Sequence, residues 1–256
     1  MKMIDAHIHL DQYSDKEIAM ILDDANRIEA LISVSFNLSS CERNLQLLKK
    51  YAKVYGAFGY HPEQRLPSDS EKNDLFQWIC SNFDEMIAVG EVGLPYYLRK
   101  DGKITRNQFE EHIELLNLFI QKAKKWEKPI ILHAVYDDAP IVCDYLENYS
   151  IQKAHFHWFK GDLKTCERMI KNGYYISVTP DIVYEEEIQK IVKIYPIDQM
   201  MIETDGPWPF EGPFTGKMTH PNMMADSINM IARIKNLTVN EVGNRLLENT
   251  KHFYQL

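Results

Sequence analysis

Apolar and polar positions along the chain follow two different patterns. Eight short runs, each about 4 to 7 residues long, have the length of buried strands, and longer segments between them carry apolar residues at helical spacing, as over 109–123. The strands are predicted at 3–9, 31–36, 54–60, 86–92, 129–134, 154–159, 174–178 and 199–204. Because neighbouring parallel strands need crossover connections, this alternation predicts an α/β fold, a TIM-type (β/α)8 barrel.

Helix-capping residues mark several of the boundaries. Thr238 is followed three residues later by Glu241, a spacing typical of a capping box at the start of the last helix. Further helix ends are predicted at Ser39 or Ser40, at Asp137 or Asp138, and at Asn172-Gly173. The helices are expected to be scaffold.

Length and composition agree with one barrel. The chain has 256 residues, of which 45% are hydrophobic, and this suffices for the core of a single domain over 1–256. Its formal charge of −8 comes without a block of Lys and Arg, so composition alone does not indicate a nucleic-acid-binding protein. Any contact with nucleic acid would be local to the cleft.

Signals for membranes and for disulfides are missing from the sequence. No apolar segment of signal-peptide length precedes the first strand, and no stretch approaches 18 uninterrupted apolar residues. The four cysteines form no Cys-x-x-Cys pair and are expected to be reduced packing residues, mostly in helices. We therefore expect a cytoplasmic protein without membrane contact, and no obligate protein partner is inferred.

Residues that bind metals recur at the carboxyl ends of the predicted strands. His7 and His9 are two residues apart, so in a strand both side chains point to one face, with Ile8 on the other. The full set is His7, His9, Glu91, His133, His157 and Asp205. One histidine at a strand end is more often a hydrogen-bonded structural residue, but barrel enzymes gather their chemistry at this end. The recurrence predicts a shared site for two metal ions.

The ligand types favour particular ions. Four neutral imidazoles suit Zn²⁺, Mn²⁺, Co²⁺, Ni²⁺ or Fe²⁺ better than Mg²⁺, which prefers oxygen and water. We expect two divalent ions of the first group, with Mg²⁺ able to occupy one weaker position.

Five motifs carry a family resemblance across essentially the whole chain. They are Ile-Asp-Ala-His-Ile-His-Leu-Asp at 4–11, Gly-Tyr-His-Pro at 59–62, Gly-Glu-Val-Gly-Leu at 90–94, His-Trp-Phe-Lys-Gly at 157–161 and Glu-Thr-Asp-Gly-Pro at 203–207. In this order they resemble the TatD family of metal-dependent hydrolases (TatD-like DNases), which belongs to the amidohydrolase superfamily. The resemblance implies a TIM-type barrel with two divalent ions that acts on DNA or another phosphoester in its cleft.

The resemblance also implies a role for each site residue. One metal would be bound by His7, His9 and Asp205, the other by His133 and His157, with Glu91 as the bridge. A water molecule held between two cations loses a proton near neutral pH and becomes the nucleophile. Asp205 is the best candidate to accept that proton, so Asp205 and Glu91 are the predicted catalytic residues.

Other residues are expected close to the metals. The resemblance implies that His61 contacts the substrate phosphate, although it could instead cap its loop. Lys160 stands where the family usually has Ser and would bring a cation to the mouth of the site. Glu203 shares a face with Asp205 and could hold a ligand histidine in place, whereas His155 is expected to pack in the interior.

Departures from the family pattern concern the substrate. Val135 stands where family members commonly have an arginine that clamps a phosphate. Pro95 replaces a common Asp, and Thr219-His220-Pro221-Asn222 also departs from the family stretch. The loops at 95–103 and 207–217 are rich in aromatic and basic residues and should hang over the metals, where they would suit a flat or anionic substrate.

Three functions remain open on the sequence. The first is a TatD-like DNase or phosphoesterase that uses a two-metal-activated water. The second is a hydrolase of a small amide, lactone or ester, which uses the same chemistry and which the loss of arginine at Val135 favours. The third is a metal-stabilised binding protein without turnover, and the intact Glu91 and Asp205 argue against it.

Overall fold

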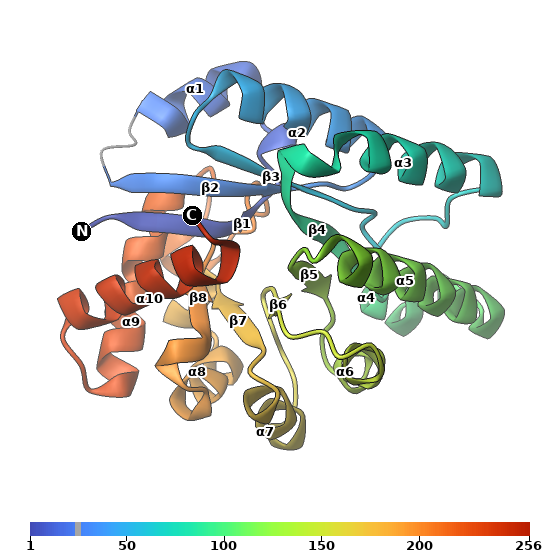
Figure 1. The fold of residues 1–256 in the computed structure, drawn as a ribbon. Coiled ribbons are helices and arrows are strands. Elements are labelled where there is room, and N and C mark those ends of the chain that lie inside the picture. The colour runs from blue at the N-terminus through green and yellow to red at the C-terminus, as the bar shows by residue number, and fades with distance from the viewer. Residues whose placement is uncertain (24–26) are drawn as a thin grey trace.

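Eight parallel strands form one sheet in sequence order, and the helices lie around its outer side (Figure 1). The computed structural model describes residues 1–23 and 27–256. The strands are β1 (Met3–Ile8), β2 (Ile28–Val34), β3 (Val54–Phe58), β4 (Met86–Gly93), β5 (Ile130–His133), β6 (Ala154–Phe156), β7 (Tyr175–Val178) and β8 (Met200–Ile202). Each strand pairs in parallel with the next. The predicted TIM-type barrel is confirmed.

Helices follow the strands and cover the sheet from outside. They are α1 (Asp15–Asp23), α2 (Leu38–Lys50), α3 (Asp69–Asn82), α4 (Tyr96–Lys100), α5 (Arg106–Trp126), α6 (Asp138–Asn148), α7 (Leu163–Lys171), α8 (Glu186–Ile194), α9 (Met224–Lys235) and α10 (Val239–Tyr254). Figure 1 shows α10 returning to the start of β1, so that the two ends of the chain lie close together.

The segment that follows β8 is joined to β1 by hydrogen bonds, which bring the two edges of the sheet together. The Asp5 carboxylate accepts hydrogen bonds from the Thr204 backbone N–H at 3.0 Å and from the Thr204 hydroxyl at 2.5 Å. One step further along, the Asp205 N–H donates to the His7 carbonyl at 2.9 Å. These bonds bring the first and the last predicted metal ligands of the chain side by side.

The core has two apolar layers on opposite faces of the strands. On β2, Leu31 belongs to the larger cluster under the helices and Ile32 to the smaller cluster in the barrel interior, as expected of side chains that alternate. Phe253 and Tyr254, at the end of α10, pack against the interior cluster. The last turn of the last helix therefore reaches the inside of the barrel.

Some predicted strand boundaries were wrong. β2 starts earlier than predicted, at Ile28, whereas β6 ends at Phe156 and β8 at Ile202, earlier than predicted. The chain turns sharply at these ends, since Trp158 has a φ of 38° and Asp205 a φ of 50°, in the left-handed region. His157 and Asp205 thus follow their strands and do not lie on them, and the turns aim them over the barrel mouth.

Two predicted helix caps need correction. The cap of α2 is Asn37, whose side chain accepts a hydrogen bond from the Ser40 N–H, because Ser40 uses its own hydroxyl to donate to Asp11. Asp137 stands at the start of α6 without a capping hydrogen bond, and Asp138 pairs with Arg99 at 2.5 Å.

The other two predicted helix ends are confirmed. Thr238 and Glu241 form the predicted capping box at the start of α10. Asn172 ends α7, and Gly173 follows it with a φ of 74°.

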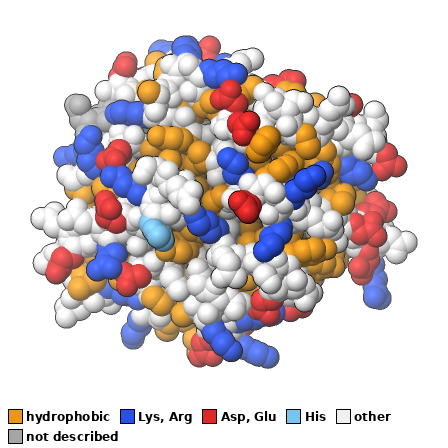
Figure 2. Space-filling model, viewed as in Figure 1, with side chains coloured by type: hydrophobic (Ala, Val, Ile, Leu, Met, Phe, Trp, Pro, Cys, Tyr) orange, Lys and Arg blue, Asp and Glu red, His pale blue; other side chains and the backbone are white. Residues whose placement is uncertain are grey.

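Three further expectations can be compared with the structure. The cysteines Cys41, Cys80, Cys143 and Cys166 are free and lie on helices, as predicted, but Cys80 is exposed and is not the packing residue expected. Over the described part of the chain, no helix combines the length and the apolar character needed to cross a membrane. Figure 2 shows acidic and basic side chains interspersed over the face in view.

Candidate metal centre

The predicted ligands converge over the carboxyl ends of the strands, and all of them are buried. They come from distant parts of the chain, namely the end of β1, β4, the end of β5 and the turns after β6 and β8. Their side chains form two clusters that share Glu91. Strand register produces this convergence, because equivalent ends of a parallel barrel meet at one mouth.

The first cluster joins His7, His9 and Asp205 to one oxygen of Glu91. The Nε2 atom of His7 lies 3.2 Å from both Glu91 Oε2 and Asp205 Oδ1. The Nε2 atom of His9 lies 3.2 Å from Glu91 Oε2 and 3.5 Å from Asp205 Oδ1. Two imidazole nitrogens and two carboxylate oxygens therefore face a common point.

The second cluster surrounds the other oxygen of Glu91. His157 Nε2 lies 2.7 Å from Glu91 Oε1, and His133 Nδ1 lies 3.1 Å from it. His61 Nε2 is nearly as close, at 3.3 Å. The structure thus places His61 among the histidines of this cluster, and its Nδ1 accepts a hydrogen bond from the Glu63 N–H at 3.1 Å, as expected of the alternative in which His61 caps its loop.

The carboxylates and histidines of the two clusters shift one another's pKa values. Burial disfavours ionised Glu91, but the facing histidines His157, His61 and His7 overcome it and hold the pKa of Glu91 well below its usual value. Burial and His157 oppose protonation of His7, yet Glu91 and Asp205 outweigh them and raise the pKa of His7 to about 9. Glu91 and Asp205 therefore stay ionised, and a positive charge beside them would stabilise their buried negative charge.

Unpartnered polar atoms show that the clusters suit cations. His7 Nε2, Glu91 Oε2 and Asp205 Oδ1 are buried without a hydrogen-bond partner. Leaving such atoms buried and unsatisfied is costly. Ligand atoms that share one ion at about 2 Å lie roughly 3 Å from each other, which matches the spacing found here. The donor set therefore fits divalent metal ions.

Sequence reasoning missed Glu63. Its carboxylate accepts hydrogen bonds from the backbone N–H groups of Tyr97 and Leu98, and its Oε1 lies 3.3 Å from His133 Nε2. His133 is thereby held at both nitrogens, one toward Glu91 and one toward Glu63. Glu63 directly follows the Gly-Tyr-His-Pro motif, but only the fold brings it to His133.

Glu203 lies behind His157, and His155 lies further inside the barrel. Glu203 Oε1 is 3.7 Å from His157 Nδ1 and accepts a hydrogen bond from the Trp158 N–H at 2.7 Å. His155 lies in the barrel interior, where burial lowers its pKa well below the usual value. His155 is not simple packing, however, because both its ring nitrogens have polar partners.

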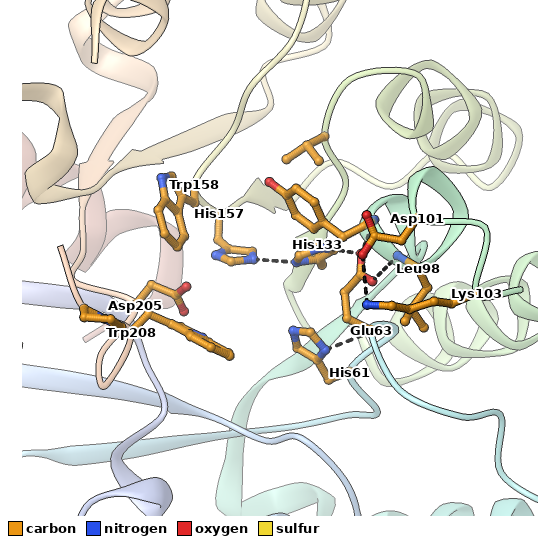
Figure 3. A pocket seen from close by; sticks show the side chains of 13 residues that line it. His61, Glu63, Leu98, Asp101, Lys103, His133, His157, Trp158, Asp205 and Trp208 are labelled. Carbon is orange, nitrogen blue, oxygen red and sulfur yellow. Dashed lines mark hydrogen bonds and ion pairs between the residues drawn. The ribbon is translucent and has the colours of Figure 1, made fainter. Parts of the chain in front are cut away.

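A cavity of about 550 Å³ opens above the clusters. His61, His133, His157 and Asp205 form part of its wall, and Figure 3 shows Trp158 and Trp208 on the Asp205 side, with Glu63, Leu98 and Lys103 on the other. Residues of both predicted loops line it, and the first of these loops contains α4. The cavity wall is thus largely aromatic and apolar.

Lys160 lies behind this wall. Its ammonium sits over the Trp158 ring, 5.4 Å from the ring centroid, and 3.9 Å from the Asp181 carboxylate. Of the described residues that line the cavity, Lys103 is the basic one, and its ammonium pairs with the Asp101 carboxylate at 2.9 Å. Val135, where the resemblance leads one to expect an arginine, lines the cavity.

Known proteins with similar sequence and structure point to one family. The family model described as TatD related DNase matches residues 4–255. A Haemophilus influenzae protein named an uncharacterized metal-dependent hydrolase is 39% identical over 99% of this chain and all of its own. A human protein named deoxyribonuclease TATDN3 is 30% identical over 94% of this chain and 90% of its own.

Solved structures agree in fold. A TatD homologue from Escherichia coli superposes with a TM-score of 0.86 at 25% identity, covering 99% of this chain and 98% of its own. A TatD family hydrolase from Entamoeba histolytica gives a TM-score of 0.84 at 19% identity, with 99% of this chain and 98% of its own covered. The family model over 4–255 and the Haemophilus influenzae and human relatives show that the chain belongs to the TatD-related family of metal-dependent hydrolases.

Proposed function

We propose that this hydrolase uses two divalent ions to activate water and that it cleaves a phosphoester such as DNA. Glu91 is the observation that carries the proposal, because its two oxygens face separate clusters of buried imidazoles. The phosphoester substrate is supported by the human relative, which is named a deoxyribonuclease.

The clusters divide the ligands between two positions. His7, His9 and Asp205 would hold one ion, His133 and His157 the other with His61 beside it, and Glu91 would bridge them. Imidazole nitrogen favours Zn²⁺, Mn²⁺, Co²⁺, Ni²⁺ or Fe²⁺. Such ions supply positive charge that lowers the pKa of a water molecule and offsets charge on the substrate.

The chain itself supplies proton transfer and positioning. Ionised Asp205 accepts the proton of the attacking water, and Glu63 fixes the ring of His133. Trp158 and Trp208 offer flat apolar surfaces beside Asp205, which suit a planar group such as a nucleobase. Lys103 is the cation of the lining that would face an anionic group.

The double variant His7→Ala/His9→Ala is expected to bind about one divalent ion per chain where the wild type binds about two. These residues provide the nitrogen ligands of the first cluster, and the second cluster keeps its own. Metal analysis after reconstitution measures the stoichiometry. His133→Ala/His157→Ala is the matched control and should empty the opposite position. Full occupancy of both positions in either double variant would contradict the division of ligands.

A second candidate is a hydrolase of a small amide, lactone or ester. Val135 in the cavity wall favours it, because an apolar side chain stands where a phosphate clamp would help a nuclease. A metal-reconstituted activity screen separates the two candidates. It sets single-stranded DNA, duplex DNA and phosphodiester reporters beside amide and lactone panels, with Asp205→Ala as the blank. Turnover confined to the amide and lactone panels would reject the phosphoesterase.

Val135→Arg is expected to raise kcat/KM for a phosphodiester and to make it fall more steeply with added salt. An arginine here would reach into the cavity and bind the phosphate through paired hydrogen bonds. Val135→Met is the control for side-chain length without charge. Lys160→Ala should have a smaller effect than Lys103→Ala, since Lys160 lies behind Trp158. If Val135→Arg leaves phosphodiester cleavage unchanged, the phosphate does not bind beside this wall.

A further inference from the structure

Four buried polar side chains form a chain of hydrogen bonds through the barrel interior. Tyr254, at the end of α10, places its hydroxyl 2.7 Å from His155 Nδ1. His155 Nε2 lies 2.6 Å from the hydroxyl oxygen of Ser177 on β7. The Ser177 hydroxyl in turn donates to Glu203 Oε2. None of the four residues is more than 4% exposed.

The directions of these bonds follow from the chemistry of the groups. A carboxylate can only accept, so Ser177 donates its proton to Glu203. The Ser177 oxygen is then free to accept the N–H of His155 Nε2, and a neutral ring keeps Nδ1 as an acceptor for the Tyr254 hydroxyl. Each of the three hydrogen bonds is therefore donated in the direction of Glu203, from Tyr254 to His155, from His155 to Ser177 and from Ser177 to Glu203.

Glu203 connects this chain to the proposed metal centre. Its other oxygen accepts the Trp158 N–H at 2.7 Å and faces His157 Nδ1 at 3.7 Å. The opposite nitrogen of His157 points at Glu91, 2.7 Å away. His157 Nδ1 is buried without a hydrogen-bond partner, so Glu203 contacts it as an ion-pair partner and not through a hydrogen bond. A carboxylate behind a ligand histidine orients the ring and raises its basicity.

We propose that Tyr254, His155 and Ser177 are positioning residues that hold Glu203 against His157 and so link the last turn of α10 to the metal centre. The proposal rests on the proposed role of His157 as a metal ligand. Loss of the Ser177 hydroxyl removes the donor that contacts Glu203 directly. Tyr254 acts two hydrogen bonds further away, by fixing the His155 ring at its Nδ1. The effect of a substitution on His157 should therefore be smaller the more hydrogen bonds separate the substituted residue from Glu203, and so smallest at Tyr254.

Zinc titration of the metal-free protein tests the proposal, with a chromophoric chelator as competitor. Ser177→Ala is expected to weaken one of the two zinc positions by about tenfold, within the range seen when an outer partner of a ligand histidine is lost. Tyr254→Phe should weaken the same position by less, and Ser177→Thr, which keeps the hydroxyl, should restore wild-type affinity.

Tyr195→Phe is the matched control. Tyr195 is equally buried, and its hydroxyl donates at 2.8 Å to the Tyr174 carbonyl, outside the chain of bonds to Glu203. Both Tyr→Phe variants remove one buried hydrogen bond and should lose similar thermal stability. Only Tyr254→Phe should change zinc affinity, and it carries the test if Ser177→Ala does not fold.

Hydrogen exchange provides a readout that does not depend on activity. Because coupling between two sites is reciprocal, zinc should slow amide exchange over α10 in the wild type and less so in Ser177→Ala. Zinc affinities equal to those of Tyr195→Phe at both positions, in Ser177→Ala and in Tyr254→Phe, would overturn the proposal. Two filled positions in His157→Ala would instead overturn the metal assignment, and this proposal with it.

Discussion

Asp205→Asn is expected to retain the fold and to lose turnover by about 10²- to 10⁴-fold, the usual effect of losing a general base. Burial opposes ionisation of Asp205, but His7, His157 and His9 prevail and hold its pKa below the usual value. The wild-type side chain is therefore ionised at neutral pH and has an oxygen free to accept a proton from a water molecule beside it. An asparagine can still offer an oxygen to a metal but cannot accept that proton.

The measurement is kcat on the best substrate from the activity screen, over the full pH range, together with metal content. Asp11→Asn is a suitable control, since Asp11 follows His9 closely and an amide can still accept its hydrogen bond from the Ser40 hydroxyl. That variant should keep nearly wild-type turnover. Near wild-type kcat in Asp205→Asn at all pH values would exclude Asp205 as the proton acceptor.

Glu91→Gln should have an even broader effect, because it should empty both metal positions. Glu91 is the residue that both clusters share, and its two oxygens lie between 2.7 and 3.3 Å from the histidine nitrogens around them. A neutral amide offers one oxygen and removes the buried negative charge. We expect both affinities to fall by more than the roughly 10- to 100-fold that loss of an outer partner produces.

Metal content and zinc affinity of Glu91→Gln, measured beside Glu63→Gln, test this prediction. Glu63 also lies 3.3 Å from a histidine of the clusters, but it contacts His133 from the side away from Glu91. Glu63→Gln should keep two ions with weaker binding at one position. If Glu91→Gln retains two ions at wild-type affinity, Glu91 does not bridge them.

The comparison of both variants separates two functions of the carboxylates. Asp205→Asn should leave metal content nearly unchanged while turnover falls, whereas Glu91→Gln should lower both. Glu91 is fully buried between imidazoles, and Asp205 lies at the cavity wall where a substrate can approach. We therefore expect Asp205, and not Glu91, to exchange a proton with water at the cavity.

Local patterns were enough to predict the barrel and six of the residues in the clusters, but not the places of His61 and Glu63. The alternation of short apolar runs with helical spacing depends on side chains a few residues apart, so it is readable without the fold. His7 and His9 show the same locality, because two residues of separation place them on one face. The convergence of all six predicted ligands follows from a rule that ties strand ends to one mouth.

Other features required the tertiary structure. Glu63 meets His133 and Tyr254 meets His155 across many intervening residues, and no local spacing links them. Lys160 is close in sequence to His157, yet the sharp turn at Trp158 sends its ammonium behind the cavity wall toward Asp181. The sequence by itself thus determined the barrel and the six side chains that converge at its mouth, since strand ends can be recognised from short-range patterns. Strand register, turn geometry and the docking of α10 decided which groups stand behind those side chains and which face the cavity, because such contacts form only when distant segments pack together.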